Sequence, residues 1–425
     1  MKLNNSLLVQ ELIKYSQFLR NKLIKNTSLK IDFIYVAVLL GLILINYFIS
    51  IRIYGGQEFF VNWASARLLF MQGINPYSQE ALKLLSDLAK ELFILPSGGN
   101  FQFISPIYSL FIYLPFGLIK NFYLSRAIWI TVMELTAFVS GYLILTIFNW
   151  RPEKLIKNVF FAFSLIFFFM ILNLLNGSNL VFLNLLYILG LKLILDGKYV
   201  RAGILLALLT INIQTFFIPL ITIFIYVICR KAWNFPLWFF ITIILFSLIG
   251  SLFITDWPLL LFRELLRNPL YANFGLPGEI VNQWVGTTQP WIWNGLSLIL
   301  LALLFYELLF FKNDKDSFLW KISLAFVLNP LIWMRTDLNS LVTLLLPFGL
   351  IFSQWINRDK QVGSIFTILF STIFSFGLLC VGLLTQSILF IKPYPFFLYI
   401  FPLIILLLNL YWIRWWMVRN IPALY

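Results

Sequence analysis

Residues 55–77 read GGQEFFVNWASARLLFMQGINPY and follow directly after the first hydrophobic stretch of the chain. The polar residues Glu58, Asn62 and Ser65 fall at i, i+4 and i+7, and apolar residues repeat the same spacing one position later. This pattern predicts a helix with one polar and one apolar stripe that ends at Gly73. We expect such a helix to lie flat at a membrane surface, with its carboxylate facing water or a cavity.

The chain around this stretch is strongly apolar. Of its 425 residues, 61% are hydrophobic and 11% are charged, and the mean hydropathy is +0.91. This composition is typical of a polytopic membrane protein and excludes an ordinary soluble domain. The formal charge of +14 comes from Lys and Arg residues scattered at the ends of hydrophobic segments. We therefore attribute the charge to membrane topology and anionic lipids, and we expect no nucleic-acid partner.

Several kinds of chemistry are excluded by residue types that the chain lacks or uses sparingly. It contains no histidine and two cysteines, Cys229 and Cys380, both within hydrophobic runs. A Cys/His metal site, a Ser-His-Asp triad and histidine acid–base chemistry are therefore excluded. The acidic residues show no metal-ligand spacing, which argues against a metal site. Proton transfer would have to use Asp, Glu, Lys, Tyr or water.

The distribution of charge predicts the orientation of the chain. Residues 1–31 interleave basic and apolar side chains, which predicts a cytoplasmic basic interfacial helix and a cytoplasmic N-terminus. A transmembrane domain over 32–425 follows. Its first span delivers the loop 54–100 to the outer face, where the loop has room for two surface helices, the second starting at Ser78 as N-cap. A second large polar region, 255–290, is also expected outside.

About twelve crossings are predicted from runs of roughly 20 apolar residues. Strict alternation places Arg230-Lys231 inside, but it puts the basic residues of 151–157 and 198–201 outside. In a second topology, 101–119 enters only part-way and 202–229 breaks near Asn212 into two short helices, which is possible only if the break lines protein or a cavity. Both topologies remain open. The predicted runs are 33–53, 101–119, 126–148, 158–175, 180–195, 202–229, 234–254, 291–311, 319–333, 338–356, 363–384 and 387–412.

A census of the 17 acidic residues narrows the candidates for catalysis. Glu58 and Asp337 stand out because each lies beside a hydrophobic span on the outer side, where partial burial changes the pKa of a carboxylate. Glu58 has a simpler interpretation as an acid favoured at a helix N-terminus. Glu134 lies in mid-span, either as a functional group or as a hydrogen-bonding partner of neighbouring helices. The other outer-face acids are Glu80, Asp87, Glu91, Asp256, Glu264 and Glu279.

The pattern of residues in 55–77 resembles the first outer loop of glycosyltransferase family 87, which contains polyprenyl-phosphate-sugar-dependent, mannosyltransferase-like enzymes of the GT-C superfamily. Glu58 falls at the acidic position of the family, where Asp is usual. Later landmarks occur in the order of the family, although Ile107 replaces a proline, Asn212 and Gln214 stand where a lysine is frequent, and a late-loop histidine is absent. The resemblance rests on Glu58-Phe59, Trp63, Ala66–Leu69, Gly73, Asn75–Tyr77, Phe103–Pro106, Leu114–Phe116, Asn176–Asn179, Gly203–Gln214, Asn329-Pro330, Arg335–Leu338 and Pro347.

The resemblance implies an all-α, GT-C-like membrane bundle with amphipathic helices in its first outer loop. It further implies an inverting transfer of a mannose-like sugar from a polyprenyl-phosphate donor to a lipid or glycan acceptor, at the outer face of a bacterial plasma membrane. Glu58 would be the general base, and no cofactor or metal would be needed. Arg335, beside Asp337, is the first choice for the cation that binds the phosphate. The substrate-binding residues expected with it are Asn62, Arg67, Tyr77, Arg263, Arg267 and Asp337.

Two other functions fit the same sequence. A lipid or polysaccharide transporter would also have basic inner loops and polar breaks within its spans, and Glu134 would then be its midplane site. A non-catalytic scaffold subunit would need neither acid. The location of the essential acid, in the first outer loop or at the midplane, distinguishes the enzyme from the transporter.

Overall fold

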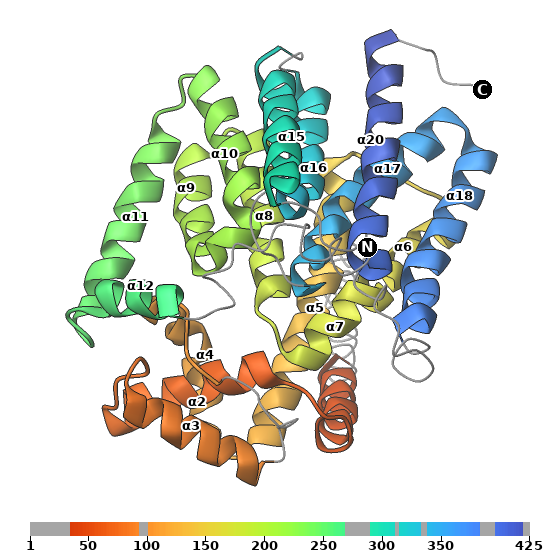
Figure 1. Ribbon diagram of the computed structural model, residues 1–425. Helices are drawn as coiled ribbons and strands as arrows, with labels where there is room; N and C mark the ends of the chain where they lie inside the picture. Colours follow the sequence, from red (N-terminus) through yellow and green to blue (C-terminus); the bar gives the residue numbers. More distant parts are fainter. Residues whose placement is uncertain are drawn as a thin grey trace, which may run out of the picture.

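The computed structural model describes residues 35–92, 101–267, 290–310, 314–332, 338–382 and 396–419. Every regular element in these ranges is helical and none is a strand, which confirms the predicted all-α polytopic membrane fold (Figure 1). The basic helix expected over 1–31 lies outside the described residues. So do Arg335, Asp337 and most of the outer region 255–290.

Short 3-10 or π-helical pieces join or extend several of the α-helices. The first described helix is Tyr35–Arg52. The elements that follow are α2 (Gln57–Gln72), α3 (Gln79–Glu91), η1 (Ile107–Ser109), α4 (Leu110–Gly117), α5 (Phe122–Ile147), α6 (Lys154–Ile166), α7 (Phe168–Asn176), α8 (Leu180–Leu195), α9 (Tyr199–Ala207), η2 (Leu208–Asn212), α10 (Ile213–Cys229), α11 (Asn234–Ser251), α12 (Trp257–Arg267), α15 (Pro290–Phe310), α16 (Lys315–Ile332), η3 (Leu338–Leu344), α17 (Leu345–Arg358), α18 (Lys360–Thr372), η4 (Ile373–Gly377), η5 (Phe396–Ile400) and α20 (Phe401–Arg419).

Eight helices in the described ranges are long and apolar enough to cross a membrane, and three shorter apolar helices accompany them. The predicted number of about twelve counted every apolar run as a crossing. The stretch Ile107–Gly117 shows why that count differs. A helix of this length rises only about 17 Å, roughly half of the hydrocarbon thickness of a bilayer. This length fits the second of the two predicted topologies, in which 101–119 does not cross.

The long run from α9 to α10 forms a helical hairpin. The start of α9 packs against the start of α11, where a Cβ on Gly203 would lie 2.6 Å from the carbonyl oxygen of Phe235. Since α11 begins five residues after α10 ends, both ends of the hairpin lie at the same end of the bundle. Asn329 of α16 holds the break between α9 and α10, donating to the carbonyl oxygens of Gln214 and Thr215, each at 3.1 Å.

Many helix ends that carry basic residues lie together at one end of the bundle, which we call the basic end. Lys360, at the start of α18, lies 3.4 Å from Glu153, which precedes α6. The guanidinium of Arg358, at the end of α17, stacks on Trp416 of α20 at 4.2 Å. The linker between α10 and α11, the linker between α17 and α18 and the end of α20 lie together at the top of Figure 1. Because α6 and α9 begin at this end, the basic residues of 151–157 and 198–201 lie with Arg230-Lys231.

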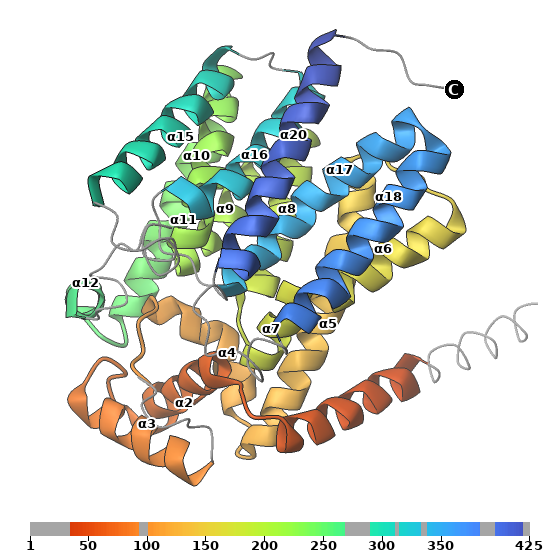
Figure 2. The same cartoon turned by 45° about the vertical axis from the view of Figure 1, so that its right-hand side comes forward.

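The opposite end of the bundle carries α2, α3 and α12 (Figure 1). As predicted, Ser78 caps α3 by accepting the Ala81 N–H, and Gly73 ends α2 in the left-handed conformation with φ 69°. In contrast to the expectation of a surface helix, α2 packs between α3 and the bundle (Figure 2). Its polar stripe is not fully exposed to solvent, because Asn62 and Ser65 are buried together with Phe59 and Phe60. Of the two helices, α3 is the amphipathic one.

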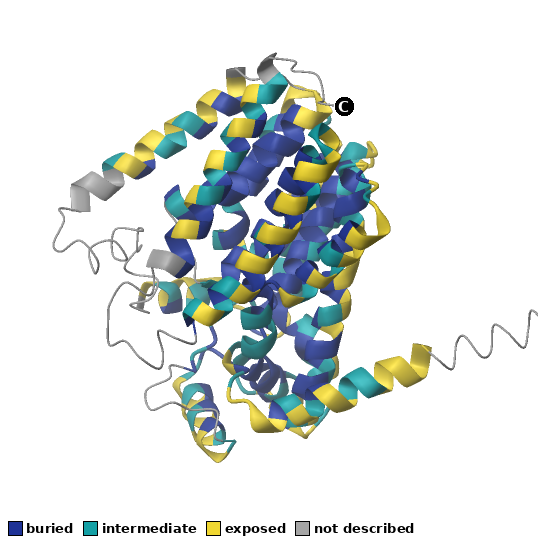
Figure 3. Ribbon diagram, turned by 90° about the vertical axis from the view of Figure 1, so that its right-hand side faces the viewer, coloured by how far each residue is buried: buried dark blue, intermediate teal, exposed yellow. Residues whose placement is uncertain are grey.

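Burial divides the bundle unevenly. The helices at its centre are buried on most faces, whereas the first helix is exposed along most of its length (Figure 3). Only 11% of the 18 residues Tyr35–Arg52 are buried within the protein, so most of this helix faces the surroundings of the bundle. In a membrane these surroundings are lipid.

Candidate active site

Glu58 lies in the first turn of α2 and reaches the start of α8. Its Oε1 accepts a hydrogen bond from the Ser178 hydroxyl at 3.0 Å and one from the backbone N–H of Asn179 at 3.4 Å. The carboxylate is half-buried. Two stretches that the sequence singled out separately, 55–77 and 176–179, therefore meet at this carboxylate. The two donors fix its orientation relative to the bundle, which a solvated acid at a helix N-terminus would lack.

Close backbone packing makes this contact possible. Gly177 ends α7 with φ 69°, and a Cβ there would lie 2.5 Å from the Cβ of Phe59. A side chain at residue 177 would therefore push α2 away from α7. Trp129 of α5 supports both partners, since its Nε1 donates to the Gly177 carbonyl oxygen at 3.0 Å and its ring stacks on Phe59 at 5.5 Å.

One turn earlier on α5, Arg126 ties two chain segments together. Its Nη1 donates to the carbonyl oxygens of Ser50 and Ile53, at 3.3 and 3.0 Å, and its Nη2 donates to that of Leu175 at 2.8 Å. The side chain is 1% exposed. Ile53 precedes Glu58 by five residues and Leu175 precedes Ser178 by three. Arg126 therefore holds together the two segments that deliver the carboxylate and its donor, and we call this arrangement the Arg126 clamp.

Asn339, from a late segment of the chain, contacts the end of α7, close to the turn that carries Ser178. Asn339, at the start of η3, accepts hydrogen bonds from the Asn176 side chain at 3.0 Å and, through its carbonyl oxygen, from the Asn173 side chain at 2.8 Å. The segment that follows Asp337 is thus fastened to the end of α7. Neither Arg335 nor Asp337 is itself described, so their predicted roles stay predictions.

Two buried polar side chains, Tyr113 and Asn179, lie in the wall beside Glu58. They interact with each other, and Tyr113 also interacts electrostatically with Glu58. The Tyr113 ring stacks on Trp129 at 4.8 Å. The surroundings of the carboxylate therefore combine polar groups with a stacked aromatic pair.

Three predicted substrate-binding residues near Glu58 have partners within the protein. Asn62 donates to the Glu58 carbonyl oxygen at 2.8 Å, and Arg67 donates to the Gly117 carbonyl oxygen at 2.7 Å. The Tyr77 hydroxyl donates to the Ser105 carbonyl oxygen at 2.6 Å, and burial raises the pKa of Tyr77 well above its usual value. The contacts of Arg67 and Tyr77 fasten α2 and its following turn to the segment 101–119, whereas that of Asn62 stays within α2. Nothing in the structure tests the predicted contact of these residues with substrate.

The two arginines expected from the second outer region belong to α12. Arg263 lies 2.9 Å from the buried carboxylate of Glu264, which also accepts a hydrogen bond from Gln102. About half of the Arg263 side chain remains exposed. The side chain of Arg267 is outside the described part of the structure. The hydrogen bond from Gln102 to Glu264 joins α12 to the segment before η1. A role of Arg263 or Arg267 in phosphate binding stays a prediction.

Glu134, the intramembrane acid, hydrogen bonds to a neighbouring helix. It accepts a hydrogen bond from Asn46 of the first helix at 2.9 Å, and Asn46 also donates to Thr131 at 2.9 Å. Asn46 is fully buried in this contact. Of the two sequence interpretations of Glu134, the geometry matches the one in which it joins neighbouring helices.

Sequence reasoning did not select Ser178, Asn179 or Arg126 as site residues. The family resemblance includes the motif Asn176–Asn179, but which of its atoms reach Glu58 depends on the turn at Gly177. Arg126 carried a usable signal, because an arginine inside an otherwise apolar helix must find acceptors or anions. Among the described residues, no group of three or more Cys, Asp or Glu residues is placed to hold a metal ion.

Comparison of the sequence with known families identifies the family of the chain. The model of glycosyltransferase family 87 matches residues 103–333, which is more than half of the chain. The match includes the segment of Ser178 and the polar break, and it begins after Glu58. No curated protein and no solved structure matches the chain. The chain is a multi-pass membrane protein and belongs to glycosyltransferase family 87.

Proposed function

We propose that the protein transfers a mannose-like sugar from a polyprenyl-phosphate donor to a lipid or glycan acceptor, with inversion at the anomeric carbon and with Glu58 as general base. The observation that carries the proposal is the half-buried Glu58 carboxylate held by Ser178 and Asn179. Membership of the family supports sugar transfer as the reaction. The donor, the acceptor and the role of Glu58 are the parts that we add.

In the proposed step, the acceptor oxygen attacks the anomeric carbon while the bond from that carbon to the phosphate oxygen breaks. The acceptor proton passes to Glu58, and polyprenyl phosphate leaves with the bonding electron pair. A single displacement of this kind inverts the configuration. The hydrogen bonds to Oε1 hold the carboxylate in one orientation before the acceptor arrives, which contributes to rate because positioning lowers the entropic part of the barrier.

The leaving phosphate requires positive charge, for which we propose Arg335 first and Arg263, Arg267 and Arg67 next. In sequence, Arg335 precedes by four positions Asn339, whose contacts join η3 to the end of α7. Asn62, Tyr77 and Asp337 are proposed to support substrate binding. We propose that no metal or cofactor takes part.

The site lies at the end of the bundle opposite to the basic end. By the positive-inside rule the basic end faces the cytoplasm. We therefore propose that transfer occurs at the outer face of a bacterial plasma membrane, that the N-terminus is cytoplasmic, and that the lipid-linked donor enters from the outer leaflet. The exposed first helix borders the segment that leads to Glu58 and offers lipid a route to the site.

The direct experiment incubates membranes that contain the protein with labelled polyprenyl-phosphate mannose, glucose or arabinose, and asks which label moves to an acceptor. General-base catalysis contributes roughly 10²–10⁴-fold to rate. Glu58→Gln should lose transfer by a factor in this range while folding normally, whereas Glu134→Gln should retain transfer. Full activity of Glu58→Gln would show that Glu58 is not the general base. Loss of lipid translocation in Glu134→Gln, with no sugar transfer by the wild type, would favour the transporter.

A further inference from the structure

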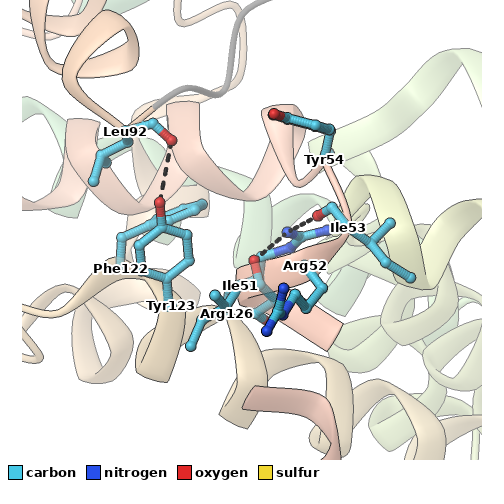
Figure 4. Close-up of a pocket in the computed structure, with 10 residues that line it drawn as sticks. Ile51, Arg52, Ile53, Tyr54, Leu92, Phe122, Tyr123 and Arg126 are labelled. Atoms are coloured by element: carbon cyan, nitrogen blue, oxygen red, sulfur yellow. Dashed lines mark hydrogen bonds between the residues drawn. The ribbon is translucent and has the colours of Figure 1, made fainter. Parts of the chain in front are cut away.

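A cavity of about 230 Å³ lies beside the Arg126 clamp, between the end of the first helix and the start of α5 (Figure 4). It is lined by residues 50–55, Leu92, Phe122, Tyr123 and Arg126. We propose that this cavity binds the phosphate group of a membrane lipid, held by Arg52 and Arg126. Glu58 is not among the lining residues.

The first argument is charge. Two guanidinium groups and no carboxylate line the cavity, and among the described residues neither Arg52 nor Arg126 has a carboxylate within ion-pair distance. Burying a cation without a counter-ion is costly. The three carbonyl oxygens around Arg126 offset part of this cost, but its Nε has no hydrogen-bond partner. An anion in the cavity would supply the missing charge.

The second argument is the kind of anion. Arginine presents a planar fork of donors that matches phosphate oxygens, and it stays charged at every physiological pH. Phe122 and Tyr123 begin the 26-residue helix α5, whose N-terminus adds partial positive charge at the same place. Tyr123 donates its own hydroxyl proton to the Leu92 carbonyl oxygen at 3.3 Å, so it closes the cavity wall instead of neutralising the arginines.

The third argument is the route for a lipid tail. Leu44, Phe48 and Ile51 are exposed on the first helix and repeat at i, i+4 and i+7, which places them on one stripe. The stripe ends at the cavity, since Ile51 lines it and Arg52 follows. A hydrocarbon tail lying along this stripe brings its phosphate to the two arginines. The expected ligand is therefore a phosphate monoester on a lipid chain, either a prenyl phosphate or a diacylglycerol phosphate.

Binding to the purified full-length protein in an uncharged detergent tests the proposal without any sugar transfer. The probes are farnesyl phosphate, farnesol, dioleoyl phosphatidic acid and inorganic phosphate. Arg52→Gln is the informative variant, because Arg52 is exposed and makes no contact in the clamp. Lys120→Gln is the matched control, because Lys120 is an exposed cation two residues before α5 that does not line the cavity.

We expect Arg52→Gln to weaken farnesyl phosphate binding about tenfold, which corresponds to about 1.4 kcal/mol, and Lys120→Gln to leave it unchanged. Tighter binding of farnesyl phosphate than of phosphatidic acid would identify a prenyl source, and the reverse order a bilayer phospholipid. Equal binding of farnesol and farnesyl phosphate would overturn the phosphate site, as would equal losses in the two variants. Inorganic phosphate that binds as tightly as either lipid would overturn the lipid as the source. Because no transfer is measured, failure here is distinct from failure of the proposed reaction.

Discussion

Gly177 and Phe59 approach so closely that a Cβ added at residue 177 would lie 2.5 Å from the Cβ of Phe59. This approach brings α2 onto the turn between α7 and α8. Glu58, which precedes Phe59, then contacts Ser178, which follows Gly177. The glycine is required twice, because its φ of 69° also lies in the left-handed region.

Gly177→Ala should therefore displace Glu58 from Ser178 and lower both stability and transfer. Gly73→Ala provides a matched control, because Gly73 has the same φ of 69° but no atom within 4 Å of an added Cβ. The left-handed conformation alone costs about 1–2 kcal/mol for a residue other than glycine. We expect Gly73→Ala to show only this loss in detergent-solubilised unfolding, and Gly177→Ala to exceed it by about 1–3 kcal/mol. Equal losses would show that packing against Phe59 is unimportant.

Ser178→Ala removes the side-chain donor at 3.0 Å from the Glu58 carboxylate. A hydrogen bond to a charged group contributes about 1.5–3 kcal/mol, so we expect the rate of transfer at saturating donor to fall roughly 10- to 100-fold. Ser140→Ala serves as the control, since Ser140 is equally buried but bonds only to the Thr136 carbonyl oxygen of its own helix. Steady-state rates of label transfer measure the difference. An unchanged rate in Ser178→Ala would show that this bond does not position the acid.

Arg126→Lys keeps a positive charge but loses the fork that reaches three carbonyl oxygens from two segments. We expect the maximal rate of transfer to fall at least tenfold. Since the clamp acts through the position of Glu58, the double variant Arg126→Lys/Glu58→Gln should be no slower than Glu58→Gln alone. Multiplicative losses in the double variant would contradict this positioning role. Unfolding curves of Arg126→Lys identify any loss that comes from misfolding.

Asn46→Leu tests the attachment of the first helix to α5. It leaves Glu134 and Thr131 without the amide donor they share, so unfolding should become easier by about 1–3 kcal/mol. Transfer per folded molecule should remain close to that of the wild type, because neither acceptor lies at Glu58. Detergent unfolding and activity normalised to folded protein provide the two measurements. A selective loss of activity at unchanged stability would assign Glu134 a role in function.

Tyr77 makes stability depend on alkaline pH. Its pKa is raised above 10.0 by burial, so the folded protein holds the phenolic proton at a pH where the unfolded chain releases it. The resulting contribution to stability is complete below pH 10 and is lost as the pH rises above that value. Unfolding measured between pH 8 and 11 should show a decline that Tyr77→Phe makes shallower. Parallel curves for the two proteins would show that other groups cause the decline.

The sequence predicted the helical class, the end of α2 at Gly73 and the start of α3 at Ser78, because each depends on local pattern or capping. It did not predict that Asn62 and Ser65 are buried, since a polar stripe looks the same whether water or another helix covers it. The pairing of Glu58 with Ser178 joins residues 120 positions apart, and no local pattern specifies such a pairing. An arginine inside the apolar α5 signals that Arg126 needs acceptors, but these are backbone carbonyl groups, which every residue provides, so the sequence does not specify which of them it binds.

The Arg126 clamp also sets an order of assembly during synthesis. At about 5–20 residues per second, ribosomes add the residues between Glu58 and Ser178 in about 6–24 seconds. The carbonyl oxygens of Ser50 and Ile53 lack their donor until Arg126 of α5 has been synthesised. The Glu58 carboxylate lacks the Ser178 donor until the start of α8 has been synthesised. A nascent chain arrested before residue 178 therefore has the acid without its partner, and the site matures only when the middle of the protein has entered the membrane.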